Sequence, residues 1–378
     1  MINKVLSYAA SSKPLMGLLS KAAFTFSQLF PSQFALSIRL ASWAFRLGDV
    51  KISRILTILG FVLLLLLLVV PFLIPVSTSG TQSYKEVAGP GATFATAQGT
   101  QIYYEKTDFV CQADKDCTNP PVIFLLHGFG ASTFSYREVT KPLSEIGDVI
   151  AYDRPGFGLT ERPTSWEGEN PYGSVGQDLI LDELISEFAS GRDVILVGHS
   201  AGGTLAAQYV VDNKDAVQGL ILISPAILTT GGTPSWLNWV YSIPQLDHLG
   251  PLLVSSIASS GMDLLNESWY NQDLITDEVK AGYRKPLEII GWEEGFWEYN
   301  RAPRAFDIKD RLAEIDVPTL LVTGDTDTVV ATADTEALAG LIKDSVLFVI
   351  PQSGHLAQEE TPEDTIKAIR VVWSILTR

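Results

Sequence analysis

A five-residue motif near the middle of the chain holds the residue best suited to act as a nucleophile. Gly198-His199-Ser200-Ala201-Gly202 joins the apolar run VILV to a segment of helix length, AGGTLAAQYVVDN. A G-x-S-x-G motif at a strand-to-helix turn is a nucleophile elbow: its glycines allow a tight backbone, and the serine hydroxyl is exposed at the end of the strand. The motif therefore predicts Ser200 as a nucleophile, and the alternative is a tight turn without a chemical role.

A serine hydroxyl is a poor nucleophile at neutral pH and needs a base, which a carboxylate usually orients. The chain has four histidines, so the base can be sought by elimination. His199 is adjacent to the serine, His127 ends an apolar run, and His248 lies in a Trp-rich region without strand patterns. The remaining His355 follows Ser-Gly in a loop before the C-terminal helical segment and is the predicted base. The alternative is that His355 only caps that helix.

The carboxylate is expected at the end of the preceding strand, because parallel strands bring their carboxyl ends to one edge of a sheet. The run TLLVTGDTDTVV offers two candidates there, Asp325 and Asp327. The residues alone leave both open.

With these motifs in the order Ser, Asp, His, the chain resembles the α/β-hydrolase superfamily over about residues 92–378. Members of that superfamily carry the acid in a G-x-x-D pattern, which here corresponds to Gly324-Asp325-Thr326-Asp327. The resemblance therefore implies Asp327 as the acid. A serine nucleophile also argues against the dehalogenase and epoxide-hydrolase branches, which are similar to this chain but use Asp at that position.

The resemblance also implies an oxyanion hole. His127-Gly128-Phe129-Gly130 is similar to the HG loop of the family, which implies that the Phe129 N–H is one of the two donors that the tetrahedral intermediate needs. The other donor is the N–H of Ala201, the residue after the nucleophile. The segment DRPGFG at residues 153–158 is similar to a D-x-x-G-x-G turn whose role in the family is structural.

These motifs need a sheet that positions them, and the chain has the pattern for one. Short Val/Ile/Leu-rich runs alternate with longer amphipathic segments, which predicts an α/β fold with a mostly parallel sheet and helices on both faces. Residues from about 227 to 310 interrupt the alternation, hold five of the eight tryptophans and predict an inserted helical cap. Strands are expected at 100–108, 122–128, 149–153, 194–200, 219–226, 319–325 and 345–351, and helices at 174–190, 201–213 and 361–377.

An uncharged stretch precedes this domain. Residues 55–76, ILTILGFVLLLLLLVVPFLIPV, would extend roughly 33 Å as a helix, enough to cross a hydrocarbon core of about 30 Å. The sequence therefore predicts a transmembrane helix, preceded by a membrane-proximal segment at 1–54 and followed by a linker at 77–91. Apolar and basic residues within 14–47 suit helices lying on a membrane surface, or a helical pair packed in the bilayer or against a partner.

The charge distribution predicts the orientation of this helix. Residues 1–54 hold seven Lys or Arg and one Asp, for a charge of +6, whereas the whole chain has a net charge of −16. The positive-inside rule then predicts a single-pass protein with a cytoplasmic N-terminus and the acidic domain on the extracytoplasmic side. A cleaved signal peptide and an organelle transit peptide, with an organelle membrane as the location, are the alternatives.

The acidic body, at −22, would repel phosphates, which excludes nucleic acid as a partner. Cys111 and Cys117 have the wrong spacing for a zinc knuckle and are expected to form a disulfide in an oxidising compartment, with two free thiols as the alternative. Without a ligand cluster or a dinucleotide fingerprint, neither a metal nor an organic cofactor is expected.

The layout resembles membrane-anchored hydrolases of the monoacylglycerol-lipase type. It implies hydrolysis of a carboxylic ester, either a small-molecule ester or a lipid ester such as an acylglycerol, through an acyl-enzyme. Two alternatives remain open: another acyl chemistry on the same triad (lactonase, amidase, carbon–carbon bond hydrolase or acyltransferase), or a non-catalytic membrane-tethered binding protein. Cap aromatics such as Tyr241, Tyr270 and Tyr299 are expected either to line an acyl pocket or to form the core of the cap itself.

Overall fold

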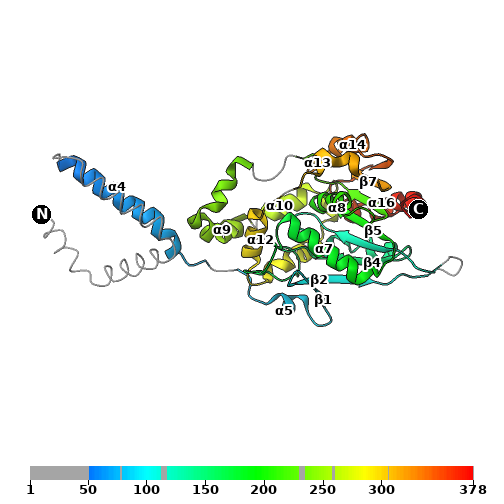
Figure 1. Cartoon of the computed structure of the whole chain (residues 1–378), viewed down its shortest axis with the longest axis horizontal. Helices are drawn as coiled ribbons and strands as arrows, with labels where there is room; N and C mark the ends of the chain where they lie inside the picture. The colour runs from blue at the N-terminus through cyan, green and yellow to red at the C-terminus, as the bar shows by residue number, and fades with distance from the viewer. Residues whose placement is uncertain are drawn as a thin grey trace. The chain divides into compact units, whose positions relative to one another are not determined.

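A computed structural model of the chain describes residues 51–76, 79–111, 117–229, 235–257, 260–304 and 306–377 (Figure 1). The chain divides into two compact units. One comprises Met1–Val76 with Trp239–Leu249, and the other comprises Ser77–Asn238 with Gly250–Arg378. The surface helices expected within residues 14–47 lie outside the described residues.

The larger unit contains an eight-stranded sheet in the order β1-β2-β4-β3-β5-β6-β7-β8. The strands β1 and β2 pair antiparallel, β2 pairs antiparallel with β4, and all later pairings are parallel. The expected mostly parallel α/β sheet is confirmed. The strands are β1 Thr93–Ala97, β2 Thr100–Thr107, β3 Val122–Leu126, β4 Asp148–Tyr152, β5 Val194–His199, β6 Gly219–Ile223, β7 Thr319–Gly324 and β8 Ser345–Ile350.

The first strand was not among those expected from the sequence. Apart from Phe94, its residues TFATA are small or polar, and they lack the apolar run that marks the buried strands. It forms a hairpin with β2 through Gln98 and Gly99, which both have positive φ (47° and 71°). Two such residues give the tight turn whose twist matches that of the flanking strands.

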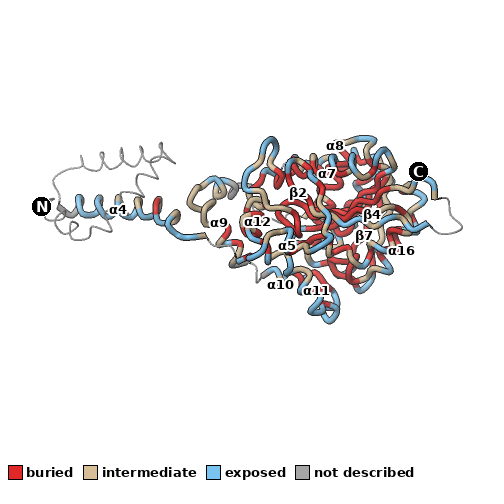
Figure 2. The backbone as a smooth tube through the Cα atoms, turned by 90° about the horizontal axis from the view of Figure 1, so that it is seen from below, coloured by how far each residue is buried: buried red, intermediate tan, exposed pale blue. Residues whose placement is uncertain are grey.

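Helices cover both faces of the sheet, because alternate residues of each central strand point to opposite sides. One apolar cluster includes Phe124 of β3 and Leu196 of β5, and the other includes Leu125 and Val197 of the same strands. The first cluster packs under α7 Ser174–Ala189, α8 Ala201–Asp212, α13 Ile308–Arg311, η6 Leu312–Glu314 and α14 Thr332–Ala339. The second packs under η2 Thr133–Tyr136, α6 Thr140–Leu143, α15 Ala357–Glu360 and α16 Pro362–Leu376. Figure 2 shows these buried residues in red along the strands.

The strand order places a topological switch at the centre of the sheet. After β3 the chain proceeds to β4 on one side and then returns to β5 on the other side of β3. In open α/β sheets, ligands bind outside the carboxyl ends of the strands at such a point. The residues that follow β3 and β5 therefore lie where a ligand is expected.

The segment expected to form a cap is helical in its described elements. These are η3 Ser235–Ser242, α9 Pro244–Ile257, α10 Ser260–Glu267, η4 Gln272–Leu274, α11 Asp277–Arg284, η5 Lys285–Glu288 and α12 Trp292–Arg301. Trp269, Trp292 and Trp297 are buried, which indicates that these three tryptophans form the core of this region.

The chain that enters the larger unit is bound to the cap before it reaches the sheet. Ser79 donates its backbone N–H and its hydroxyl to one oxygen of Glu293, at 2.6 and 2.7 Å. The Trp292 indole N–H donates to the Ser79 hydroxyl at 2.9 Å. Gln82 forms a parallel bridge with Ile289. The helix α5, Tyr84–Ala88, then begins with a capping box.

The predicted apolar helix is present as α4, Lys51–Val69, closed by the turn η1, Val70–Leu73. Its stretch Arg54–Leu73 has a mean hydropathy of 3.0, and only 6% of its residues are buried. By length and composition, this helix could cross a membrane.

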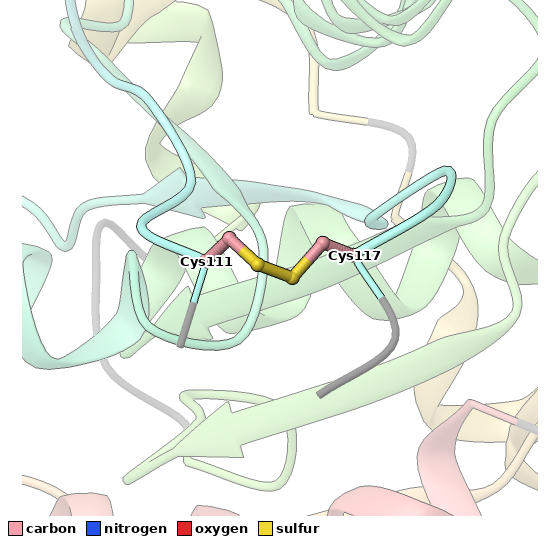
Figure 3. The surroundings of a disulfide bond; sticks show 2 residues. All are labelled: Cys111 and Cys117. Atoms are coloured by element: carbon pink, nitrogen blue, oxygen red, sulfur yellow. A yellow bond between two sulfur atoms is a disulfide. The ribbon is translucent and has the colours of Figure 1, made fainter. Parts of the chain in front are cut away.

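The two cysteines form a disulfide, Cys111–Cys117, with Cα atoms 5.7 Å apart (Figure 3). The bridge closes the loop between β2 and β3. The pairing that the sequence left open is present in the structure, and residues 112–116 inside the loop lie outside the described residues.

Because α8 closely approaches β3, a single methyl group added at Gly202 should strongly destabilise the fold. A Cβ at Gly202 would lie 2.1 Å from the carbonyl oxygen of Leu126, so that backbone would have to move. We expect Gly202→Ala to lower the free energy of unfolding by about 1–3 kcal/mol, measured by chemical denaturation.

The matched control is Gly261 in α10, where a Cβ would meet nothing within 4 Å. Gly261→Ala should leave stability unchanged or raise it by up to about 1 kcal/mol, because alanine favours helix. Equal effects of the two substitutions would contradict the proposed contact.

Candidate active site

The backbone at Ser200 has a conformation that non-glycine residues rarely adopt. Its φ is 52° and its ψ is −121°, and it joins the last residue of β5 directly to the first of α8. Hydrogen bonds to the neighbouring strand and the loop after it help to hold it there: the Ser200 N–H donates to the carbonyl of Ile223 at 3.0 Å, and Ala226 N–H donates to the Ser200 carbonyl at 3.1 Å. Strained backbone of this kind is concentrated at functional sites.

The predicted base and acid are hydrogen-bonded to each other. His355 Nδ1 lies 2.9 Å from Asp327 Oδ2, and both residues are buried. A carboxylate only accepts, so Nδ1 carries the proton and Nε2 is left with a lone pair that can take another. The second oxygen of Asp327 accepts the N–H groups of Val329 and Val330 at 3.0 and 2.9 Å. The other candidate, Asp325, is exposed and lies 3.4 Å from the Ser353 N–H through Oδ1.

His199 connects the serine to this pair. Its Nε2 donates to the His355 carbonyl at 3.0 Å, and the two imidazole rings are 4.7 Å apart between centroids. Burial, followed by the neighbouring His355, holds the pKa of His199 well below its usual range, so the ring is neutral. Within the described residues no hydrogen bond joins the Ser200 hydroxyl to the His355 ring. In unliganded enzymes such bonds are often long and tighten only when substrate binds.

The loop after β3 approaches the serine closely. A Cβ at Gly128 would lie 3.1 Å from the Ser200 Cβ and 2.8 Å from the His199 ring. His127 fixes this loop, because its Nε2 accepts the Arg154 N–H at 2.9 Å and its Nδ1 donates to the Gly128 carbonyl at 2.8 Å. A peptide plane directs its C=O and its N–H to opposite sides. Holding the Gly128 carbonyl therefore also orients the N–H of Phe129.

Two backbone donors near the serine have no acceptor within the described residues. They are the N–H groups of Phe129 and of Ala201, the first residue of α8. The first N–H groups of a helix have no partner inside the helix and point outward with the positive end of its dipole. Both donors are therefore available to an anion.

The turn after β4 supports this loop. The buried Asp153 carboxylate accepts the N–H of Thr133 and the N–H of Leu159, each at 2.6 Å. A Cβ at Gly158, whose φ is 51°, would overlap that carboxylate. Burial raises the pKa of Asp153 to about 6.

An aromatic cluster lies against the loop. The Phe129 ring contacts Phe157, Phe296 and Tyr299, with centroids 5.6, 5.1 and 5.9 Å apart. Tyr299 is buried, whereas Tyr270 is exposed and Tyr241 is half-buried. Of the three cap tyrosines named from the sequence, only Tyr299 joins this cluster, so aromatic side chains of α12 pack next to a candidate oxyanion donor.

The cap holds the loop that carries His355. The His355 N–H donates to the Ser268 carbonyl at 2.8 Å. Glu360, buried at the end of α15, accepts the N–H of Gly354 at 2.7 Å and also those of Tyr270 and Asn271 at 3.1 and 2.6 Å. One carboxylate thus joins the histidine loop to the cap.

The adjacent Glu359 makes a second connection. It accepts hydrogen bonds from Arg137 and from the Tyr283 hydroxyl of α11. Burial raises the pKa of Glu359 to about 7 despite the attraction of Arg137. Glu359 and Glu360 were not among the residues predicted from the sequence, and His199 was considered only as a candidate for the base. Acidic residues just before a C-terminal helix are typical of an exposed first turn, and Glu363 and Asp364 are indeed exposed there.

Comparisons with known proteins agree with this architecture. Residues 123–368 match the family model described as "Alpha/beta hydrolase family". "Uncharacterized hydrolase YugF" of Bacillus subtilis is 26% identical over 71% of this chain and 92% of its own length. "Monoacylglycerol lipase abhd6-A" of Xenopus laevis is 24% identical over 66% of this chain and 74% of its own. A thermophilic esterase from Thermogutta terrifontis superposes with a TM-score of 0.56 at 20% identity, covering 76% of this chain and 99% of that one, which shows a shared fold.

The raised pKa of Glu359 predicts a pH dependence of stability. Because the folded protein holds this proton more tightly than the unfolded chain, stability falls as pH rises from about 4.5 to about 7 and levels off above. Glu359→Gln keeps a neutral side chain of the same shape at every pH. We therefore expect wild type to lose stability relative to Glu359→Gln across that range, by at most about 1.4 kcal/mol per pH unit.

The measurement is chemical denaturation of both proteins at several pH values, so that Asp153 and other titrating groups cancel in the difference. The control is Glu363→Gln, which removes an exposed carboxyl at the start of α16 and shows how much any replacement of Glu by Gln contributes. Parallel curves for wild type and Glu359→Gln would contradict the burial argument.

Proposed function

The chain belongs to the alpha/beta hydrolase family, and from that premise we propose that it is a membrane-anchored serine hydrolase that cleaves carboxylic esters. The hydrogen bond between His355 Nδ1 and Asp327 Oδ2 carries the proposal, because it leaves His355 Nε2 ready to accept a proton. His199, the residue before the strained Ser200, is hydrogen-bonded to the backbone carbonyl of the same histidine. Ser200, His355 and Asp327 form the catalytic triad of the proposed mechanism.

The reaction is acyl transfer in two steps. His355 Nε2 removes the proton of the Ser200 hydroxyl as Oγ attacks the ester carbonyl, and Asp327 stabilises the imidazolium that forms. The N–H groups of Phe129 and Ala201 bind the oxyanion of the tetrahedral intermediate. His355 then protonates the leaving alcohol, and a water molecule activated by the same histidine hydrolyses the acyl-enzyme.

The substrate class follows from the anchor. An esterase held at a bilayer meets lipid esters at high local concentration, and the relative named as a monoacylglycerol lipase supports an acylglycerol or similar lipid ester. The aromatic rings around Phe129 give an apolar surface beside the oxyanion donors, which suits an acyl chain better than a charged group.

Orientation rests on the flanks of the apolar helix and on the disulfide. The basic residues before Arg54–Leu73 favour a cytoplasmic N-terminus. The Cys111–Cys117 bridge supports an oxidising environment for the hydrolase domain, since disulfides are rare in reducing compartments.

Covalent labelling tests the nucleophile. A fluorophosphonate probe should label the full-length protein, and Ser200→Ala should abolish both labelling and ester hydrolysis. The matched control is Ser186→Ala, an exposed serine on α7, which should label like wild type. Asp327→Asn should slow hydrolysis by roughly 10³–10⁴-fold, because it favours the wrong imidazole tautomer.

Labelling that persists in Ser200→Ala would refute the assignment of the nucleophile. A panel of esters with increasing acyl length, compared with lactone and amide substrates, separates the acyl chemistries. A wild-type protein that neither labels nor hydrolyses any of them would favour a binding protein on this fold.

Protease protection tests the orientation. With an epitope tag at each end, external protease applied to sealed membranes whose cytoplasmic face is outside should remove the N-terminal tag and spare the C-terminal tag. Detergent should expose both tags, which controls for their accessibility. Removal of the C-terminal tag without detergent would place the hydrolase domain in the cytoplasm and contradict the proposed orientation.

A further inference from the structure

The end of the apolar helix has carbonyl groups that its own backbone does not satisfy. A helix leaves its last carbonyls without donors from within, and Pro71 in the closing turn η1 has no N–H to offer. In hydrocarbon, each unsatisfied backbone group costs several kcal/mol. This end of the helix therefore needs donors from another part of the chain.

The donors come from Trp239–Leu249, which groups with the apolar helix in one compact unit. Gln245 Nε2 donates to the carbonyl of Leu68 at 3.3 Å. His248 Nε2 donates to the carbonyl of Ile74 at 3.0 Å. Both bonds use side chains of α9, so this helix partly caps the apolar helix.

The segment has the composition and exposure of a membrane-surface element. No residue from Trp239 to Leu249 is buried, and Asp247 is its only acidic or basic residue apart from His248. The Trp239 side chain is 60% exposed. The His248 ring packs on Phe72 of η1, with centroids 5.4 Å apart, so an apolar contact accompanies the hydrogen bonds.

The contacts with Leu68 and Ile74 also indicate how deep the segment Trp239–Leu249 would lie in the membrane. Leu68 lies five residues before Leu73, the end of the apolar stretch, which is roughly 8 Å along a helix. Amphipathic segments at membrane surfaces insert about 5–10 Å below the headgroups, and tryptophan is enriched at that level.

We infer that Trp239–Leu249 lies in the interface of the lipid bilayer, with Trp239 at the level of the headgroups. The partner of this surface is the lipid bilayer itself, so part of the cap touches the membrane. The inference rests on the proposed membrane anchoring. A lipid partner is favoured over a second copy of the chain because the helix that binds the segment is itself exposed along its length, as at Leu63 and Leu67 (58% and 61%).

Depth-dependent fluorescence quenching tests the inference on the full chain. Trp239→Cys, labelled with an environment-sensitive fluorophore while Cys111–Cys117 stays oxidised, is reconstituted in phosphatidylcholine vesicles. The vesicles carry nitroxide lipids with the quencher either near the headgroup or near the end of the acyl chain. We expect strong quenching by the headgroup-proximal nitroxide and at least about twofold weaker quenching by the deep one, as for an interfacial position.

Two further labelled sites separate the possible failures. Leu63→Cys, in the middle of α4, reports on the span and should be quenched by the deep nitroxide. Val371→Cys, exposed on α16, reports on the hydrolase domain and should not be quenched. An unquenched Leu63 label would refute the anchoring itself. If the Leu63 label is quenched but the Trp239 label is quenched no more than the Val371 label, the interfacial position alone is overturned. A Trp239 label that is shielded by a second copy in a dimer would also overturn it.

Discussion

The tight turn at Ser200 is the constraint on which the rest of the site depends. A positive φ at a serine costs on the order of 1–3 kcal/mol and persists only where the surroundings over-determine it. Here Ile223 of β6 and Ala226 in the loop after it supply hydrogen bonds on one side, and α8 must begin at once on the other. Because α8 starts directly above the end of β3, Gly202 has no room for a side chain, and the first turn of α8 itself leaves no room for one at Gly198. The same closeness brings the loop of His127 and Gly128 against the serine, so the candidate nucleophile and the candidate oxyanion donors are positioned by one packing arrangement.

The histidine side of the site depends on contacts of a different kind. His355 sits in a loop after the last strand, and its backbone is held by His199 from the nucleophile turn and by Ser268 from the cap. Glu360 adds hydrogen bonds to both the loop and the cap. The cap is therefore part of the framework that orients the candidate base, and a displacement of Ser268 would also move the backbone of His355.

The central strands and the candidate triad could be predicted because their signals are local. Continuous Val/Ile/Leu runs mark strands buried on both faces, and Ser200 and His355 stand in short motifs next to such runs. Choosing Asp327 over Asp325 needed the family resemblance, and the structure supplies the physical difference, since Asp327 is buried against His355 and Asp325 is exposed. The strand β1 was missed because its small and threonine-rich residues are stabilised by a hairpin turn, which an apolar pattern does not detect.

Side chains that act across long sequence distances could not be predicted in this way. Glu360 contacts Asn271 almost ninety positions away, and its burial depends on how the cap folds back onto the histidine loop. Likewise, the grouping of Trp239–Leu249 with α4 joins segments separated by most of the hydrolase domain. In each case the neighbouring residues in the sequence are typical of a surface helix. Only the tertiary contact therefore reveals what these side chains do.

The attachment of Ser79 to Glu293 and Trp292 sets the length of the tether. Only five residues separate Leu73, the last of the apolar stretch, from Ser79, and a fully extended chain of that length covers roughly 20 Å. In a chain inserted as proposed, the domain cannot diffuse away from the leaflet. Its encounters with membrane-borne molecules are then confined to two dimensions, and a fatty acid released by the proposed reaction would enter the same leaflet.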